Sequence, residues 1–111
     1  MRMTDSLPRS IQDYFSGKNA RDLDIAVSGF AETATVKDEG RDHTGPAAIR
    51  AWIAETIAKY DDRATARRSA TRGNVVEVAA EVSGAFPGSP ILLRFDFTMK
   101  ADRIVRLEIA P

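Results

Sequence analysis

The sequence of 111 residues contains no cysteine and only one histidine, His43. The lack of cysteine excludes disulfide bonds, thiol nucleophiles and cysteine-ligated zinc or iron–sulfur sites. A single histidine also argues against a histidine-based metal centre, so we expect neither a metal nor a cofactor. The chain has no G-x-G-x-x-G, P-loop or G-x-S-x-G motif, and nothing therefore points to nucleotide binding or serine hydrolysis.

Neither sign of charge is in excess, because 16 Lys and Arg residues face 16 Asp and Glu residues. A nucleic-acid partner is not expected, since binding phosphates requires a basic excess. Residues 1–10 lack the apolar run of a secretory signal, and no stretch approaches membrane-spanning length. We therefore expect a cytoplasmic protein without a membrane partner, and one domain over residues 1–111.

Apolar residues at spacings of three and four predict three helices. The first begins near Pro8 and is expected to end at Gly17, and the second is expected to be capped by Asn19. The third opens at Thr44-Gly45-Pro46 and stops at Asp61-Asp62. Their apolar positions include Leu7, Ile11, Tyr14 and Phe15 in the first helix, Leu23, Ala26, Val27 and Phe30 in the second, and Ile49, Trp52, Ile53, Ile57 and Tyr60 in the third.

Alternation with a period of two predicts strands in the remainder. A short strand after Phe30 ends at Asp38, a polar turn follows over 39–43, and four further strands occupy 63–72, 76–82, 91–99 and 104–109. Helices gathered on one face of an antiparallel sheet make an α+β domain. We expect a cone-shaped, strongly curved sheet wrapped around three N-terminal helices. Its predicted inner surface carries Tyr14, Phe30, Trp52, Phe95, Phe97 and Met99.

Asp38 is the strongest candidate for a catalytic residue. Ala34, Val36 and Asp38 share one side of their strand, so the carboxylate should point towards the apolar interior. A buried carboxylate is costly unless it is paired, hydrogen-bonded or protonated, and its raised pKa would suit a general base or acid near neutral pH. The alternative is a strand-end aspartate that only accepts backbone hydrogen bonds from the following turn.

Other candidates each carry a plainer alternative. The Tyr14 hydroxyl would donate a hydrogen bond to a developing oxyanion. The alternative is that Tyr14 is only a tyrosine of the hydrophobic core. His43 would lie at the cavity entrance and shuttle protons, although an exposed loop histidine is the reading that the sequence favours. The predicted ligand contacts are Phe30, Trp52, Phe95, Phe97 and Met99, each of which is otherwise plain core.

Four sequence features support a family resemblance that covers nearly the whole chain. A tyrosine lies in the first helix, N-A-x-D-L-D opens the second, F-A-x-x-A-T-V leads into the first strand, and T-G-P-A-A-I-R-A-W opens the third helix. These motifs resemble the nuclear transport factor 2-like superfamily, and within it the SnoaL-like polyketide cyclases and the ketosteroid isomerases. The resemblance implies a cystatin-like cone with a deep apolar pocket, and a homodimer packed through the sheet.

The resemblance also implies site roles, which carry over only in part. Asp38 corresponds to the catalytic base of the ketosteroid isomerases, and Tyr14 corresponds to their oxyanion-hole tyrosine. The protonated acid that completes the oxyanion hole of the ketosteroid isomerases has no counterpart in this chain. The corresponding position is occupied by Leu93, and the nearby Asp96 should face outward. Losing one oxyanion donor typically costs about a hundredfold or more in rate. The paired carboxylate–arginine set of the related epoxide hydrolases is also missing.

Three hypotheses of function follow. In the first, Asp38 abstracts a proton next to a carbonyl of a small apolar cyclic substrate, as in an isomerase, cyclase or lyase. In the second, the same cone binds a small apolar ligand without catalysis. In the third, the cone is filled by its own side chains and the protein is a dimerisation domain.

Overall fold

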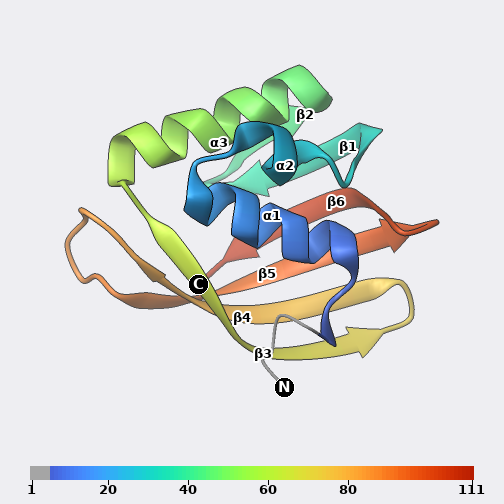
Figure 1. Ribbon diagram of the computed structural model, residues 1–111. Helices are drawn as coiled ribbons and strands as arrows, with labels where there is room; N and C mark the ends of the chain where they lie inside the picture. The colour runs from blue at the N-terminus through green and yellow to red at the C-terminus, as the bar shows by residue number, and fades with distance from the viewer. Residues whose placement is uncertain (1–5) are drawn as a thin grey trace.

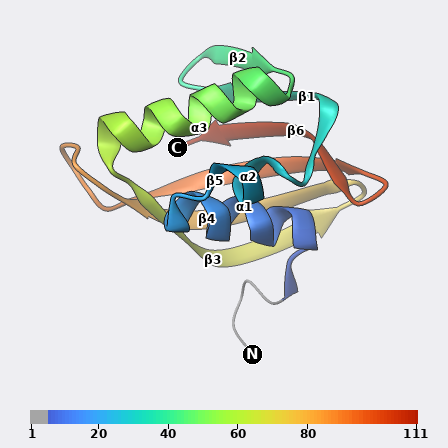
Figure 2. The same cartoon turned by 45° about the horizontal axis from the view of Figure 1, so that its top comes forward.

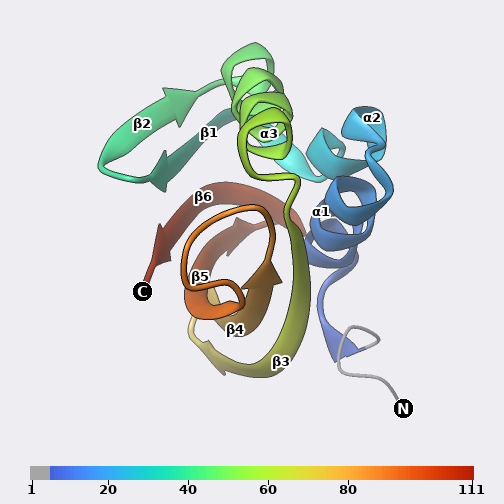
Figure 3. The same cartoon turned by 90° about the vertical axis from the view of Figure 1, so that its left-hand side faces the viewer.

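The computed structural model describes residues 6–111 and consists of one curved six-stranded sheet with three helices against its concave side (Figures 1 and 2). Seen from the side, strands β6 to β3 form a strongly curved layer, with α3 above β6 and α1 beside β3 (Figure 3). The predicted α+β class with a curved sheet around three helices is therefore confirmed. The elements are α1 (Arg9–Ala20), α2 (Leu23–Val27), β1 (Phe30–Asp38), β2 (Arg41–Thr44), α3 (Pro46–Tyr60), β3 (Arg63–Arg72), β4 (Val75–Ser83), β5 (Ile91–Lys100) and β6 (Arg103–Ala110).

The strand order is β2-β1-β6-β5-β4-β3, and each neighbouring pair is antiparallel except β1 and β6, which run parallel. The prediction of a polar turn over 39–43 was wrong in part, because Arg41–Thr44 forms the edge strand β2. This strand pairs through its backbone with the end of β1, where Asp38 faces Arg41. Its residues are polar and largely exposed, so no apolar alternation marks it in the sequence.

Two predicted helix boundaries were also wrong. The first helix continues through Gly17 to the end of α1. A Cβ atom at Gly17 would lie 2.4 Å from the Ala26 nitrogen, so this glycine permits close packing of α2 on α1. Asn19 does not cap the second helix, because its amide forms two hydrogen bonds with the backbone of Ala64. Asp22 is the cap instead, and its side chain accepts a backbone hydrogen bond from α2.

The pairing register shifts at three places in the sheet, and at two of them a single residue is skipped as in a β-bulge. In β3 the pairing with β4 skips Arg67, and all residues of this strand from Arg67 onward are exposed. In β6 the pairing with β5 skips Val105, and Ile104 and Leu107 are consequently both fully buried. Bulges increase local twist and bend the strand, which is consistent with the strong curvature of this sheet.

The hydrophobic core lies between the helices and the concave face of the sheet. The predicted inner residues are all buried except Met99, which packs against the core while partly exposed. Tyr14 is at the centre of an aromatic cluster, with its ring centroid 5.8 Å from that of Phe97 and 5.9 Å from that of Phe30. Within residues 6–111, no helix has the length and apolar character needed to cross a membrane.

Candidate functional site

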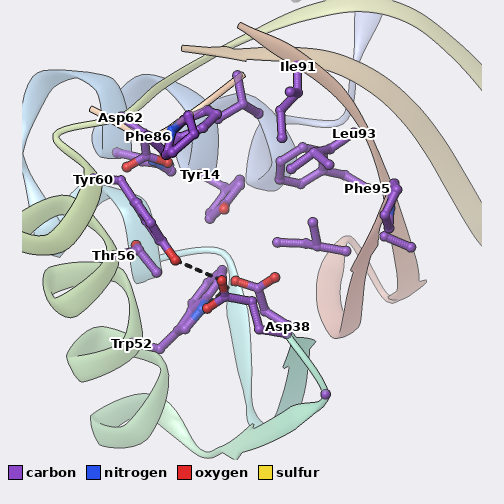
Figure 4. Close-up of a pocket in the computed structure, with 18 residues that line it drawn as sticks. Tyr14, Asp38, Trp52, Thr56, Tyr60, Asp62, Phe86, Ile91, Leu93 and Phe95 are labelled. Carbon is purple, nitrogen blue, oxygen red and sulfur yellow. Dashed lines mark hydrogen bonds and ion pairs between the residues drawn. The ribbon is translucent and has the colours of Figure 1, made fainter. Parts of the chain in front are cut away.

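The cone contains a cavity of about 600 Å³ between α1, α3 and the inner face of β4, β5 and β6. Figure 4 shows side chains of α3 on one side of this space and those of β5 on the opposite side. Most of the wall is apolar, which suits a small molecule that carries rings. Its apolar side chains include Val82, Phe86, Ile91, Leu93, Phe95 and Ile109.

Asp38 lies on the wall of this cavity at the end of β1. It shares the inward side of the strand with Val36, as the alternation predicted. Its Oδ2 atom accepts a hydrogen bond of 3.1 Å from Nε1 of Trp52, and the carboxyl also accepts one from the backbone of Glu39. Burial nevertheless raises the pKa of Asp38, because desolvation outweighs these two hydrogen bonds. The carboxyl is thus suited to exchange protons closer to neutral pH than an ordinary aspartate.

Tyr14 also lies on the cavity wall and is fully buried. Its hydroxyl has no hydrogen-bond partner among residues 6–111. Burial raises the pKa of Tyr14 well above its ordinary value, and the negative charges of Asp38 and Asp62 raise it further. The hydroxyl therefore keeps its proton at neutral pH and is available as a donor to an oxygen atom of a ligand.

A buried ion pair between Lys18 and Asp62 was missed from the sequence. The Lys18 Nζ atom lies 2.7 Å from Oδ2 of Asp62, and the two side chains are only 5% and 11% exposed. Both residues belong to the cavity wall. Burial lowers the pKa of Lys18, and the hydrogen bond from Lys18 to Asp62 opposes this change. The spacing of Leu7, Ile11, Tyr14 and Lys18 could have indicated that this lysine continues the buried stripe of α1.

The rim of the cavity is held by contacts between α3 and two loops. The Tyr60 hydroxyl donates a hydrogen bond of 2.8 Å to Oε1 of Glu39, in the turn between β1 and β2 (Figure 4). The Tyr60 ring also packs edge-on against Phe86, with the centroids 5.9 Å apart. These contacts link the β1–β2 turn, the end of α3 and the loop before β5.

The structure brings only part of the predicted site together. Trp52 and Phe95 line the cavity with Asp38 and Tyr14. Leu93 also lies on the cavity wall, as expected from its place on the inward side of its strand. The lining residues do not include Phe30, Phe97 and Met99, and Phe97 is fully buried in the aromatic core against the Tyr14 ring. Alternation identified the inward face of each strand, but it carries no information about depth along the cone.

His43 does not reach the large cavity either. It lies on β2 opposite Val36, and its ring centroid is 6.0 Å from that of Trp52. It lines a smaller hollow that Asp38 and Trp52 also border. The imidazole therefore lies against the Trp52 ring and not among the residues that line the large cavity. Across residues 6–111 there is no group of three or more His, Cys, Asp or Glu side chains that could hold a metal ion.

A curved α+β sheet closed by helices over an apolar cavity is the cystatin-like, nuclear transport factor 2-like fold. Within that fold, the model of the SnoaL-like domain matches residues 11–107. The chain therefore belongs to the SnoaL-like domain family. Among proteins with curated descriptions, none matches this chain in sequence.

Several solved structures share this fold. A protein of Sinorhizobium meliloti, provisionally assigned as a polyketide cyclase, is 38% identical over 97% of this chain and 99% of its own, with a TM-score of 0.93. A protein of Catenulispora acidiphila with a ketosteroid isomerase-like fold, in complex with trimethylamine, is 18% identical over 96% of this chain and 87% of its own, with a TM-score of 0.83. TerC, co-crystallised with polyporic acid, is 20% identical over 92% of this chain and 88% of its own, with a TM-score of 0.77.

Proposed function

We propose that this protein is a cofactor-independent isomerase or cyclase that abstracts a proton next to a carbonyl group of a small apolar cyclic substrate. The observation that carries the proposal is the presence of the Asp38 carboxyl and the Tyr14 hydroxyl on one apolar cavity. The family and the similarity to a provisionally assigned polyketide cyclase support it. The volume of about 600 Å³ is within the range of pockets that hold small organic molecules.

Each of the two polar groups has a defined role in this reaction. Asp38 takes the proton as the C–H bond breaks, and the electron pair moves onto the carbonyl oxygen to give an enolate. Tyr14 donates a hydrogen bond to that oxygen, which stabilises the developing negative charge. In an isomerisation, the protonated Asp38 then returns the proton to a different carbon atom of the enolate system, and the carbonyl group re-forms. In a cyclisation, the enolate carbon instead attacks a second carbonyl carbon of the substrate, and Asp38 gives its proton to the alkoxide oxygen that forms. The apolar walls orient the ring and exclude water.

The test is catalysed exchange of hydrogen for deuterium at the carbon next to the carbonyl of 1-tetralone, followed by NMR in D₂O. We expect exchange faster than in buffer alone. The rate should rise with pH through the raised pKa of Asp38 and then level off, because only the ionised carboxylate accepts the proton. Exchange at the buffer rate for 1-tetralone and a panel of other cyclic ketones would refute the catalytic proposal.

Replacing Tyr14 with phenylalanine should separate catalysis from stability. We expect the exchange rate to fall by about 10² to 10³, because one donor to the enolate oxygen is lost. The free energy of unfolding should stay equal or rise by about 1 kcal/mol, since the variant removes a buried hydroxyl that has no partner among residues 6–111. Denaturant titration measures the stability, and a loss of more than 1 kcal/mol would instead indicate a structural role for the hydroxyl.

A non-catalytic small-molecule binding domain is the second candidate function. It is favoured by the hydrogen bonds that Asp38 accepts from Trp52 and Glu39, because these could serve structure alone. The TerC and trimethylamine complexes and a designed 17-OHP binder show that proteins of this fold accommodate small organic molecules. Binding of cyclic ketones without exchange would favour this candidate. A homodimer, a cytoplasmic location and the absence of nucleic-acid and membrane partners stay predictions.

A further inference from the structure

We propose that the Lys18–Asp62 ion pair is a second subsite of the cavity, which binds a hydroxyl group on the ring system of the substrate. This inference rests on the proposed function for the position of the carbonyl group at Asp38 and Tyr14. It adds a substrate class, namely cyclic ketones that carry a ring hydroxyl at a distance from the carbonyl. The pair lies in the wall of the same cavity.

The ion pair offers a donor and an acceptor side by side. The bond to Oδ2 of Asp62 uses one of the three N–H donors of Lys18. The other carboxylate oxygen, Oδ1, is buried and has no hydrogen-bond partner among residues 6–111. A hydroxyl group is the smallest group that can donate to this oxygen while it accepts from the ammonium group. An ether or a carbonyl oxygen could only accept.

A purely structural role explains the ion pair less well. The end of α1 is already joined to the segment before β3, because Arg21 donates to the Asp62 carbonyl oxygen at 2.6 Å and to Oδ1 of Asp61 at 2.7 Å. Asn19 adds two hydrogen bonds to the Ala64 backbone. A buried ion pair generally contributes little net stability compared with apolar residues of similar size. We therefore attribute the two charges in this mostly apolar wall to recognition of a polar group.

The spacing along α1 defines where the hydroxyl would lie. Lys18 follows Tyr14 by four residues, so the two side chains leave the same face of the helix about 6.0 Å apart along its axis. This separation is close to the width of one six-membered ring. A ketone held by Tyr14 would thus present a hydroxyl on the far side of its ring to Lys18 and Asp62. The compound 6-hydroxy-1-tetralone has this arrangement.

The test compares binding of three ligands by calorimetry: 6-hydroxy-1-tetralone, 6-methoxy-1-tetralone and 1-tetralone. We expect the wild type to bind the hydroxy compound about tenfold or more tightly than either of the others, because only a hydroxyl satisfies both charged groups. The double variant Lys18→Met/Asp62→Leu removes the donor and the acceptor together and should lose this preference. The matched control Arg67→Met/Glu81→Leu removes an exposed ion pair of 3.0 Å between β3 and β4, and should keep it.

Two further variants keep the result decisive. Should the double variant not fold, Asp62→Asn replaces the free acceptor with an amide, and the hydroxy compound should then lose its advantage over the methoxy compound. The variant Asp38→Asn should retain the preference even if deuterium exchange is lost, so binding reports on the subsite and exchange reports on the proposed reaction. Equal affinity of the wild type for all three ligands would overturn the proposed subsite. So would a preference for the hydroxy compound that survives in Lys18→Met/Asp62→Leu as well as in the control Arg67→Met/Glu81→Leu.

Discussion

Replacing Lys18 alone with methionine is expected to lower the free energy of unfolding by about 3–5 kcal/mol. The reason is the environment of Asp62, whose side chain is 11% exposed and would keep a buried carboxylate without its cation. Its Oδ1 atom already has no hydrogen-bond partner among the described residues, so the local structure has little capacity to compensate. Urea denaturation monitored by circular dichroism measures the change.

The control for this prediction is Arg67→Met, which breaks an exposed ion pair with Glu81 and should cost less than about 1 kcal/mol. The double variant Lys18→Met/Asp62→Leu should recover most of the lost stability, because it removes both charges. If Lys18→Met costs no more than Arg67→Met, the Lys18–Asp62 pair does not behave as a buried pair, and the argument that its charges are kept for recognition fails.

The sequence predicted the elements that carry strong periodicity. The helix α3 followed from its regular three–four spacing, and the strands of the second half followed from their alternation. The inward direction of Asp38 followed in the same way, since its parity is shared with the buried Val36. These features depend on local pattern alone, which is why they could be read before the structure was known.

Features that depend on tertiary contacts could not be predicted in this way. Gly17 was interpreted as a helix end, but it permits the close approach of α2, which only the packed structure reveals. The edge strand β2 has no apolar alternation because its stability comes from pairing with β1. Asp62 was interpreted as a helix stop, and its ion pair with Lys18 joins residues 44 positions apart.

Replacing Asp38 with asparagine is expected to lower the rate of deuterium exchange by about 10² to 10⁴, which is the usual contribution of a general base. Asparagine has nearly the same volume and can still accept the hydrogen bond from Nε1 of Trp52. The cavity and its affinity for a cyclic ketone should therefore be preserved. The matched control is Asp42→Asn, which neutralises an exposed carboxylate on β2 and should leave the rate unchanged.

The same Asp38→Asn variant should be more stable than the wild type near neutral pH, by about 0.5–2 kcal/mol. Because burial raises the pKa of Asp38 in the folded state, the folded protein retains this proton to a higher pH than the unfolded chain does. The stability of the wild type consequently falls as the pH rises from the unfolded pKa, about 3.9, through the raised folded pKa. Asparagine does not titrate, so the advantage of the variant should appear over that interval and vanish below it. A variant that is less stable than the wild type by more than 1 kcal/mol at pH 7 would instead identify Asp38 as a structural acceptor for Trp52 and the β1–β2 turn.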